Sequence, residues 1–200
     1  RKNWEHWRII LYFCRMMDKQ LTLEWLSGIR TDFDEESLFR RQTMDFVQNN
    51  DQYWQRSTLA GHLTGSAWVL NPLKDKALLI HHRGLDKWFQ PGGHAETGDA
   101  SLLETARREA AEECGLQELI LLSDQVFDLD IHIIPAKNDI AQHLHYDLRF
   151  VFYTESMALD GDLAEVKDLN WVSLEDLLRK LDTQQSLRRM AIKSLSLSSF

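Results

Sequence analysis

Cysteine is scarce in this 200-residue chain, which contains Cys14 and Cys114 alone. Neither belongs to a CxxC motif or to the Cys/His spacing of a zinc site, and two thiols cannot form the disulfide framework of a small secreted domain. The sequence therefore excludes the disulfide-rich and zinc-ribbon classes. We expect a protein of the reducing cytoplasm.

Long apolar runs and an excess of basic residues are also lacking. The apolar stretch 9–14 is far too short to span a bilayer, and we see no signal-peptide cleavage pattern. The formal net charge is −8, whereas broad nucleic-acid and membrane surfaces need clustered Lys and Arg. We therefore expect neither nucleic acid nor membrane as a partner. A small phosphate-bearing ligand is still compatible, because a bound metal ion can supply positive charge locally.

Proline is rare, and no internal repeat or low-complexity tract is evident, so the length favours one domain or one domain with an appendage. The apolar fraction, 44%, is enough for a hydrophobic core. The residue pattern changes near Arg56. We therefore predict an N-terminal helical extension over residues 1–55, packed on or beside a domain over residues 56–200.

The extension should contain two helices. Apolar residues at helical spacing predict the first from Trp4 to about Leu26. The second should run from about Glu35 to Val47, with Asp34 as its N-cap. The sequence leaves open whether these helices cover the domain, form a dimer contact or shape a substrate pocket.

The rest of the chain predicts short strands around one mid-chain helix. That helix should run from about Leu102 to Cys114, because Ser101 to Glu104 fits a capping box and Gly115 stands where a C-cap glycine belongs. Strands are predicted at 63–70, 76–81, 119–122, 126–134, 148–153 and 170–172, a glycine turn at 91–93, and helices at 174–181 and 190–195. Because strands and helices do not alternate regularly, we predict an α+β fold with a mixed sheet.

Three glutamates of the mid-chain helix, Glu109, Glu112 and Glu113, share one face. At ~100° per residue, Glu112 and Glu113 lie on either side of Glu109, within roughly 60°. Taken alone, such a pattern is more often an exposed acidic face than a site. The preceding glycine turn changes this interpretation, because it can expose backbone carbonyls beside the carboxylates. Mg²⁺ prefers oxygen ligands of this kind, completed by water and substrate phosphate oxygens.

Two segments carry a known pattern. Residues 93–99 read Gly-His-Ala-Glu-Thr-Gly-Asp, and residues 108–116 read Arg-Glu-Ala-Ala-Glu-Glu-Cys-Gly-Leu. Together they resemble the signature box of the Nudix hydrolases: glycine, five residues, glutamate, seven residues, then Arg-Glu-aliphatic-x-Glu-Glu-x-Gly-aliphatic. The fixed positions that agree are Arg108, Glu109, Glu112, Glu113 and Gly115. At roughly 7% per position, chance gives such agreement on the order of 10⁻⁶ per start.

The chain departs from the box at two points. Asp99 stands at the first box glutamate, and eight residues rather than seven separate it from Arg108. Both departures concern the role of Asp99 and leave the three glutamates in place. A weaker resemblance to a bacterial NTP pyrophosphohydrolase-like subgroup covers roughly residues 35–200, carried by residues 61–67, 78–93, 128–136 and 143–147.

The resemblance implies an α/β/α sandwich around a mixed sheet. It also implies an enzyme that cleaves nucleoside diphosphates linked to another moiety, by attack of water on phosphorus. By position, Glu109, Glu112 and Glu113 would bind Mg²⁺ or Mn²⁺, with a backbone carbonyl of Gly92 or Gly93 as a further ligand. Such an ion neutralises phosphate oxygens and both acidifies and aligns a water.

The resemblance also implies roles for residues around the metal ligands. Arg108 would orient the glutamates, because it precedes Glu112 by four residues on the helix. The base that takes the proton of water would be Glu112 or Glu113, or a loop residue such as Glu155 or Glu165, since family members differ here. Zinc is not expected as the catalytic ion, because the box carboxylates are hard oxygen donors.

Substrate contacts are expected from residues near the box, which are His94, Glu96, Trp88, His143 and His145. His143 and His145 share a strand face if their segment is extended. These histidines would contact substrate phosphates or form a second metal site, although a structural hydrogen-bonding role is the commoner one. Trp88 could stack on a base, although core packing is the commoner role of a large aromatic.

Two other functions fit the same resemblance. A nucleotide-sensing module without catalysis often lacks box glutamates, whereas all three are present here. Isomerase chemistry needs a catalytic-cysteine context, but Cys114 lies inside the box helix. We therefore predict a hydrolase of a small nucleotide-type substrate. ADP-ribose, NADH, a dinucleoside polyphosphate, a modified nucleoside triphosphate and a nucleotide sugar remain open, as does a homodimer.

Overall fold

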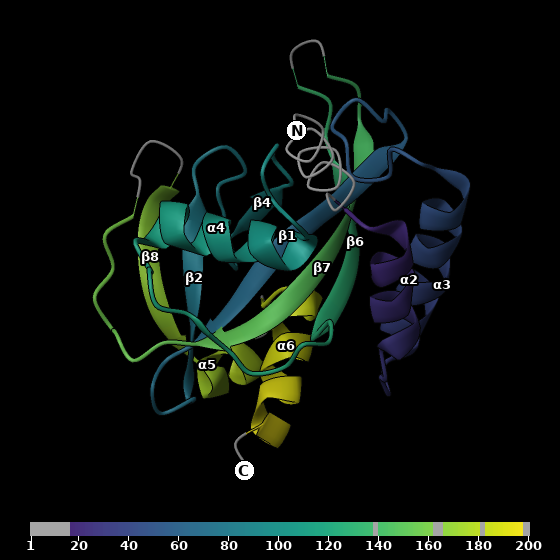
Figure 1. The fold of residues 1–200 in the computed structure, drawn as a ribbon. Coiled ribbons are helices and arrows are strands. Elements are labelled where there is room, and N and C mark those ends of the chain that lie inside the picture. The colour runs from purple at the N-terminus through teal and green to yellow at the C-terminus, as the bar shows by residue number, and fades with distance from the viewer. Residues whose placement is uncertain (1–16, 138–139, 162–165, 181–182, 198–200) are drawn as a thin grey trace, which may run out of the picture.

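The computed structural model describes residues 17–137, 140–161, 166–180 and 183–197. Eight strands form one mixed sheet, in which β1 (Gly61–Leu70) and β7 (His143–Tyr153) run parallel at the centre (Figure 1). The sheet continues on either side through antiparallel pairs: β2 (Lys76–His82), β3 (Lys87–Phe89), β4 (Gly92–His94), β5 (Ile120–Leu121), β6 (Asp128–Ile134) and β8 (Val166–Ser173).

Helices cover both faces of this sheet (Figure 1). One face carries α4 (Leu102–Cys114), and α5 (Leu174–Arg179) and α6 (Gln185–Leu197) cover the other. The helices α2 (Lys19–Gly28) and α3 (Asp34–Asn49) share the apolar core with α4. The predictions of an α+β fold, a mixed sheet and a sandwich are therefore confirmed.

The N-terminal helices contact the sheet through aromatic side chains. Trp25 of α2 meets Phe150 edge to face, with 5.2 Å between ring centroids. Phe46 of α3 stacks on Tyr146 at 4.4 Å. Residues 17–49 thus pack on the same core as the strands, and the boundary near residue 55 stays a prediction.

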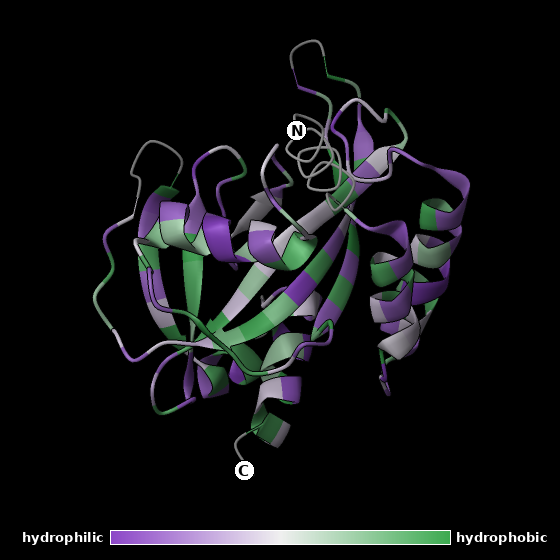
Figure 2. Cartoon of the chain, viewed as in Figure 1, coloured by the Kyte–Doolittle hydropathy of each residue, from purple (hydrophilic) through white to green (hydrophobic). Residues whose placement is uncertain are grey.

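Strand alternation gives the two faces of the sheet different characters. On β7, Tyr146, Leu148 and Phe150 belong to the apolar core on the α4 side. The intervening residues His145, Asp147 and Arg149 face the α6 side. Figure 2 shows the resulting alternation of hydrophilic and hydrophobic bands along β6 and β7. The α6 side of the sheet therefore carries a buried polar stripe.

One part of this stripe is a buried ion cluster centred on Asp128, which is fully buried. Arg189 of α6 donates to its carboxylate at 2.8 and 2.9 Å, Lys193 at 2.9 Å and Arg149 at 3.2 Å. Arg189 also donates to Glu35 of α3 at 2.8 Å. The cluster therefore joins α6 and α3 to the sheet.

The predicted mid-chain helix is confirmed at both ends. α4 spans Leu102–Cys114, and the hydroxyl of Ser101 accepts a hydrogen bond from the backbone N–H of Glu104 at 3.3 Å. Gly115 has φ of 73°, the left-handed conformation that glycine adopts without strain.

The prediction of one helix from Trp4 to Leu26 is wrong at its middle, and residues 4–16 lie outside the described ranges. Met17 has φ of 54°, and the side chain of Asp18 caps a new helix by accepting from the N–H of Gln20 at 2.8 Å. Asp34 is the first residue of α3, not its cap, which is Phe33. An aspartate there is favoured by the positive end of the helix dipole.

The predicted glycine turn is instead the short strand β4. Gly92 pairs with Ser66 and Gly93 with Gly65 across an antiparallel ladder with β1. Elsewhere the predicted strands and C-terminal helices are present with shifted ends. β7 begins at His143, five residues earlier than predicted. Among the described residues, no helix has the length and apolar character needed to cross a membrane.

Candidate active site

The face of α4 that meets the sheet is made of small and apolar residues. Leu102, Ala106 and Ala110 are fully buried. Opposite them, Gly65 of β1 has no side chain, and a Cβ there would lie 3.1 Å from the Cβ of Thr105. Beside this close approach, Glu109 and Glu113 of α4 lie against β4, whereas the side chain of Glu112 is 59% exposed.

Two of these glutamates contact the glycines of β4 directly. The carboxylate of Glu113, which is 5% exposed, accepts a hydrogen bond from the N–H of Gly92 at 2.9 Å. A Cβ on Gly93 would lie 2.6 Å from the carboxyl carbon of Glu109. Glycine is therefore required at 93 for Glu109 to occupy its position.

Arg108 joins the acidic face to its surroundings. Its Nη1 donates to Glu109 at 3.1 Å and to Glu112 at 2.8 Å, and its Nη2 donates to the carbonyl of His94 at 2.9 Å. Burial alone would lower the pKa of Arg108, but the carboxylates of Asp99, Glu109 and Glu112 raise it above its usual range. Arg108 is therefore a permanent cation that holds two box glutamates through one nitrogen.

Asp99 holds the other edge of the same guanidinium. Its carboxylate accepts from Nε and Nη2 of Arg108, from the hydroxyl of Thr105 at 2.9 Å and from the N–H of Glu96 at 3.0 Å. Burial raises the pKa of Asp99, but these hydrogen bonds outweigh it and hold the pKa below its usual value. Asp99, which stands one residue away from the usual position of the first box glutamate, thus holds the guanidinium of Arg108 in place.

The comparisons with known proteins agree with this geometry. The family model described as the NUDIX domain matches residues 61–192. The chain belongs to the NUDIX domain family. Membership confirms the prediction of an enzyme of the Nudix pyrophosphohydrolase class. No curated protein sequence matches the chain significantly.

Several solved Nudix structures resemble this chain over nearly the full length of the solved protein. A NUDIX-family hydrolase from Clostridium perfringens is 31% identical over 68% of this chain and 97% of its own, with a TM-score of 0.49. The MutT protein of Methanosarcina mazei is 19% identical over 72% and 99% of the two chains, with a TM-score of 0.55. The C. elegans Ap4A hydrolase in a binary complex is 17% identical over 69% and 98%, with a TM-score of 0.51. The last two show the Nudix fold alone.

The five residues predicted to contact substrate do not lie together in the structure. Gly93 and His94 point to opposite faces of β4, so the His94 ring lies on the α6 side of the sheet, with His143 and His145. Glu96 is exposed and contributes its backbone N–H to Asp99. Trp88 stacks on His81 at 5.0 Å and packs on the apolar cluster with α5 and α6. The three histidines and Trp88 therefore do not lie with the three glutamates.

Glu155 and Glu165 are the two loop residues that could serve as the base. Glu155 is exposed just after β7. Glu165 lies outside the described residues. Both remain predictions.

Sequence reasoning missed two buried residues on the α6 side of the sheet. His62 of β1 lies directly opposite His145 in the parallel ladder. Asp147 accepts hydrogen bonds from Thr64 at 3.0 Å and Ser66 at 2.7 Å, and also from Gln90 and Arg149. No spacing in the sequence reveals these partners, because the β1–β7 register is set by tertiary pairing.

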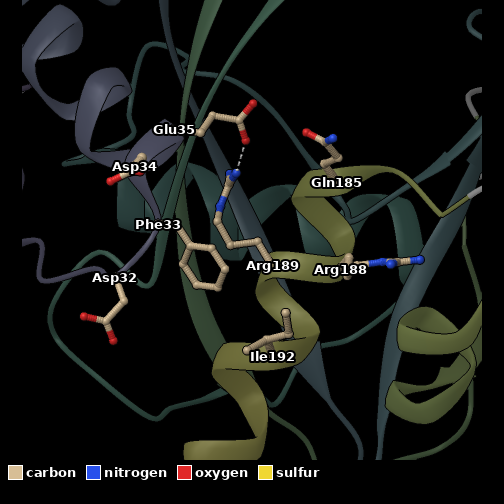
Figure 3. Close-up of a pocket in the computed structure, with 8 residues that line it drawn as sticks. All are labelled: Asp32, Phe33, Asp34, Glu35, Gln185, Arg188, Arg189 and Ile192. Carbon is tan, nitrogen blue, oxygen red and sulfur yellow. Dashed lines mark hydrogen bonds and ion pairs between the residues drawn. The ribbon is translucent and has the colours of Figure 1, made fainter.

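A recess of about 330 Å³ lies between the start of α3 and α6 (Figure 3). Its lining residues are Asp32, Phe33, Asp34, Glu35, Gln185, Arg188, Arg189 and Ile192. Arg189 and Glu35, whose ion pair is drawn in Figure 3, belong to the buried ion cluster. The recess includes no residue of β4 or α4, so it is not the candidate active site.

Proposed function

We propose that this Nudix protein hydrolyses a diphosphate linkage in a nucleoside diphosphate joined to another moiety, and that it requires Mg²⁺ or Mn²⁺. The observation that supports the proposal most strongly is the convergence on Arg108. Glu109 and Glu112 accept from the same nitrogen, and Asp99 fixes the opposite edge of the guanidinium. An acidic face that is only solvated does not require a partly buried arginine held by a buried aspartate.

The residues present fit a hard divalent cation. Glu109, Glu112 and Glu113 would hold it, with a backbone carbonyl of Gly92 or Gly93, and all of these donors are oxygen atoms. The bound ion supplies neutralisation of phosphate charge and activation of water. Glycine at 93 leaves room for the Glu109 carboxylate against β4.

The side chains of the protein orient the metal ligands and accept the proton of the attacking water. Arg108, held by Asp99, keeps the box glutamates oriented toward one region. Glu112 is the best placed of the three to accept a proton from water, because its side chain is 59% exposed. Glu113 is buried and already accepts from the N–H of Gly92.

The substrate class is tested with the full chain and five candidates: ADP-ribose, NADH, a dinucleoside polyphosphate, a modified nucleoside triphosphate and a nucleotide sugar. Each is incubated with Mg²⁺, with Mn²⁺ or with chelator, and the phosphate-containing products are separated. We expect turnover of at least one candidate in the metal-containing samples, with oxygen from labelled water on a phosphate of the product. Tight binding of one nucleotide with no turnover of any would contradict the proposal and favour the sensing function.

We also propose that residues 1–55 form an extension to the catalytic domain and that the protein acts in the cytoplasm on a small nucleotide-type substrate. The packing of Trp25 and Phe46 on strand residues supports an extension that covers the domain.

A further inference from the structure

Three histidines from three different strands meet on the α6 side of the sheet. His62 belongs to β1, His94 to β4 and His145 to β7. One ring nitrogen from each lies within 4.8 Å of the other two. Among the residues that the structure describes, no other three His, Cys, Asp or Glu side chains, the box glutamates included, have their ligand atoms gathered this closely without an ion.

The spacing of two of these nitrogens matches that of ligands on a single ion. Nε2 of His94 and Nε2 of His145 are 3.2 Å apart and share a hydrogen bond when one of them carries a proton, which a bound metal ion would replace. Two nitrogens bound tetrahedrally at ~2.0–2.1 Å from Zn²⁺ lie roughly 3.3 Å from each other. These two rings already have the separation that coordination requires, and His62, whose nitrogen lies within 4.8 Å of both, would approach by up to roughly 1.5 Å to complete the set.

His62 supplies an independent observation. Its side chain is 2% exposed, and neither ring nitrogen makes a hydrogen bond of ordinary geometry. The backbone of Thr58 raises the pKa of the ring, against the larger effect of burial. A buried polar group without a proper partner costs roughly 1–3 kcal/mol. A metal ion would bind the nitrogen lone pair of His62, which otherwise accepts no hydrogen bond.

The protonation states suit metal binding. Burial, reinforced by neighbouring histidines, lowers the pKa of His62 to about 4 and of His145 to about 2. The imidazoles of His62 and His145 are therefore neutral near pH 7, the form that binds metal. Arg56 opposes a cation, but its side chain is exposed to solvent, which screens its charge.

We propose that His62, His94 and His145 form a binding site for a divalent transition-metal ion of the Zn²⁺ type, separate from the glutamate site. Three imidazoles suit such an ion and do not suit Mg²⁺, which prefers oxygen. His143, whose ring centroid lies 5.1 Å from that of His62, borders the site. The inference does not rest on the proposed hydrolysis, because the rings lie on the face of β4 opposite Glu109.

An ion at this site would join β1, β4 and β7. His94 directly follows Gly93, and its carbonyl accepts from Arg108. The ion would therefore hold the strand against which Glu109 and Glu113 are placed. Its expected effect is to stabilise the folded chain in proportion to its binding.

The test uses Zn²⁺ as the probe and the metal-stripped full chain in excess Mg²⁺, which keeps the glutamates occupied by a hard cation. Equilibrium dialysis with metal analysis should show one Zn²⁺ per chain, and Zn²⁺ should raise Tm. In His62→Phe, which keeps a ring but no nitrogen, the affinity should fall by more than about 100-fold, exceeding the usual effect of losing an outer partner. His94→Gln, at a half-buried position, should do the same and serves if the first variant does not fold.

Two matched variants separate this site from others. His81→Gln changes a histidine outside the cluster, and Glu112→Gln changes the glutamate site. Both should keep wild-type Zn²⁺ affinity. The inference is overturned if Zn²⁺ is displaced by Mg²⁺, if His62→Phe and His94→Gln bind Zn²⁺ like the wild type, or if Glu112→Gln abolishes binding.

Discussion

Asp99 and Arg108 form a two-pronged ion pair, with 3.1 Å from Nε to Oδ1 and 3.0 Å from Nη2 to Oδ2. The geometry is that of the strongest carboxylate–guanidinium contacts, because both hydrogen bonds are charge-assisted and nearly parallel. Asp99 is 7% exposed, so water cannot replace it as a partner. Removing Arg108 therefore leaves a buried Asp99 without its counter-charge, whereas removing Asp99 leaves Arg108 paired with Glu109 and Glu112 alone.

Asp99→Asn should lower both stability and activity. The amide presents an N–H₂ group toward the guanidinium in place of an accepting oxygen, so we expect a loss of about 1–3 kcal/mol in the free energy of unfolding. Turnover should fall because Arg108 no longer holds Glu109 and Glu112. Urea denaturation and steady-state kinetics measure the two effects. Asp124→Asn, at an exposed position, is the control and should change neither.

The contribution of Asp99 to the free energy of unfolding should decrease at acid pH. Its pKa in the folded protein is depressed below the unfolded value of about 3.9. The stabilisation is therefore complete above that unfolded value and is lost as pH falls through the folded pKa. The difference in unfolding free energy between wild type and Asp99→Asn should be constant from about pH 7 to about pH 5 and shrink below about pH 4. A difference that grows toward acid pH would show that the pKa is raised instead.

Substitutions of Glu112 and Glu113 should lower turnover alike but differ in their effect on stability. Glu112→Gln changes a side chain that is 59% exposed, and we expect turnover to fall by about 10²–10⁴ with little change in Tm. Glu113→Gln should lower turnover comparably, but with some loss of Tm, because Glu113 is buried on the N–H of Gly92. Glu104→Gln lies on the same helix and is the matched control. Near-wild-type turnover in both box variants would show that the ligand assignment is wrong.

The two glycines of β4 should respond differently to alanine. In Gly93→Ala the new methyl meets the end of the Glu109 side chain, which can move, so the fold should persist while the affinity for Mg²⁺ or Mn²⁺ falls. In Gly92→Ala it would lie 2.7 Å from the Cα of Ser66, which cannot move without the strand, so Tm should fall. Metal titration and thermal unfolding of both variants test this contrast. Equal losses of Tm would contradict it.

The buried ion cluster should be far more sensitive than a surface pair. Asp128→Asn leaves Arg149, Arg189 and Lys193 without their shared carboxylate in a buried place, and breaking such a pair costs about 3–5 kcal/mol. Asp51→Asn removes the partner of Lys19 at a 97% exposed position and should cost less than about 1 kcal/mol. Chemical denaturation of both variants gives the comparison. A similar small loss in each would show that the cluster contributes little.

Local pattern and the Nudix resemblance predicted the elements that depend on near neighbours. α4 has the predicted limits because its cap, its C-cap glycine and its apolar spacing all lie within a few residues of one another. The failures occur where distant segments decide. Gly92 and Gly93 were predicted as a turn, but β1 lies beside them and offers a ladder partner. The break at Met17 and Asp18 depends on a local cap that the longer apolar pattern concealed.

The sequence alone therefore determined the chemical identity of the candidate active site: Arg108 and three glutamates at helical spacing, after a glycine pair. One face of a helix follows directly from residue spacing, so no tertiary information was needed. The tertiary structure alone decided the role of Asp99 and the gathering of His62, His94 and His145. Strand register brings the three histidines together from separate strands. The fold of the loop before α4 brings Asp99 to Arg108. Residue spacing in the sequence encodes neither arrangement.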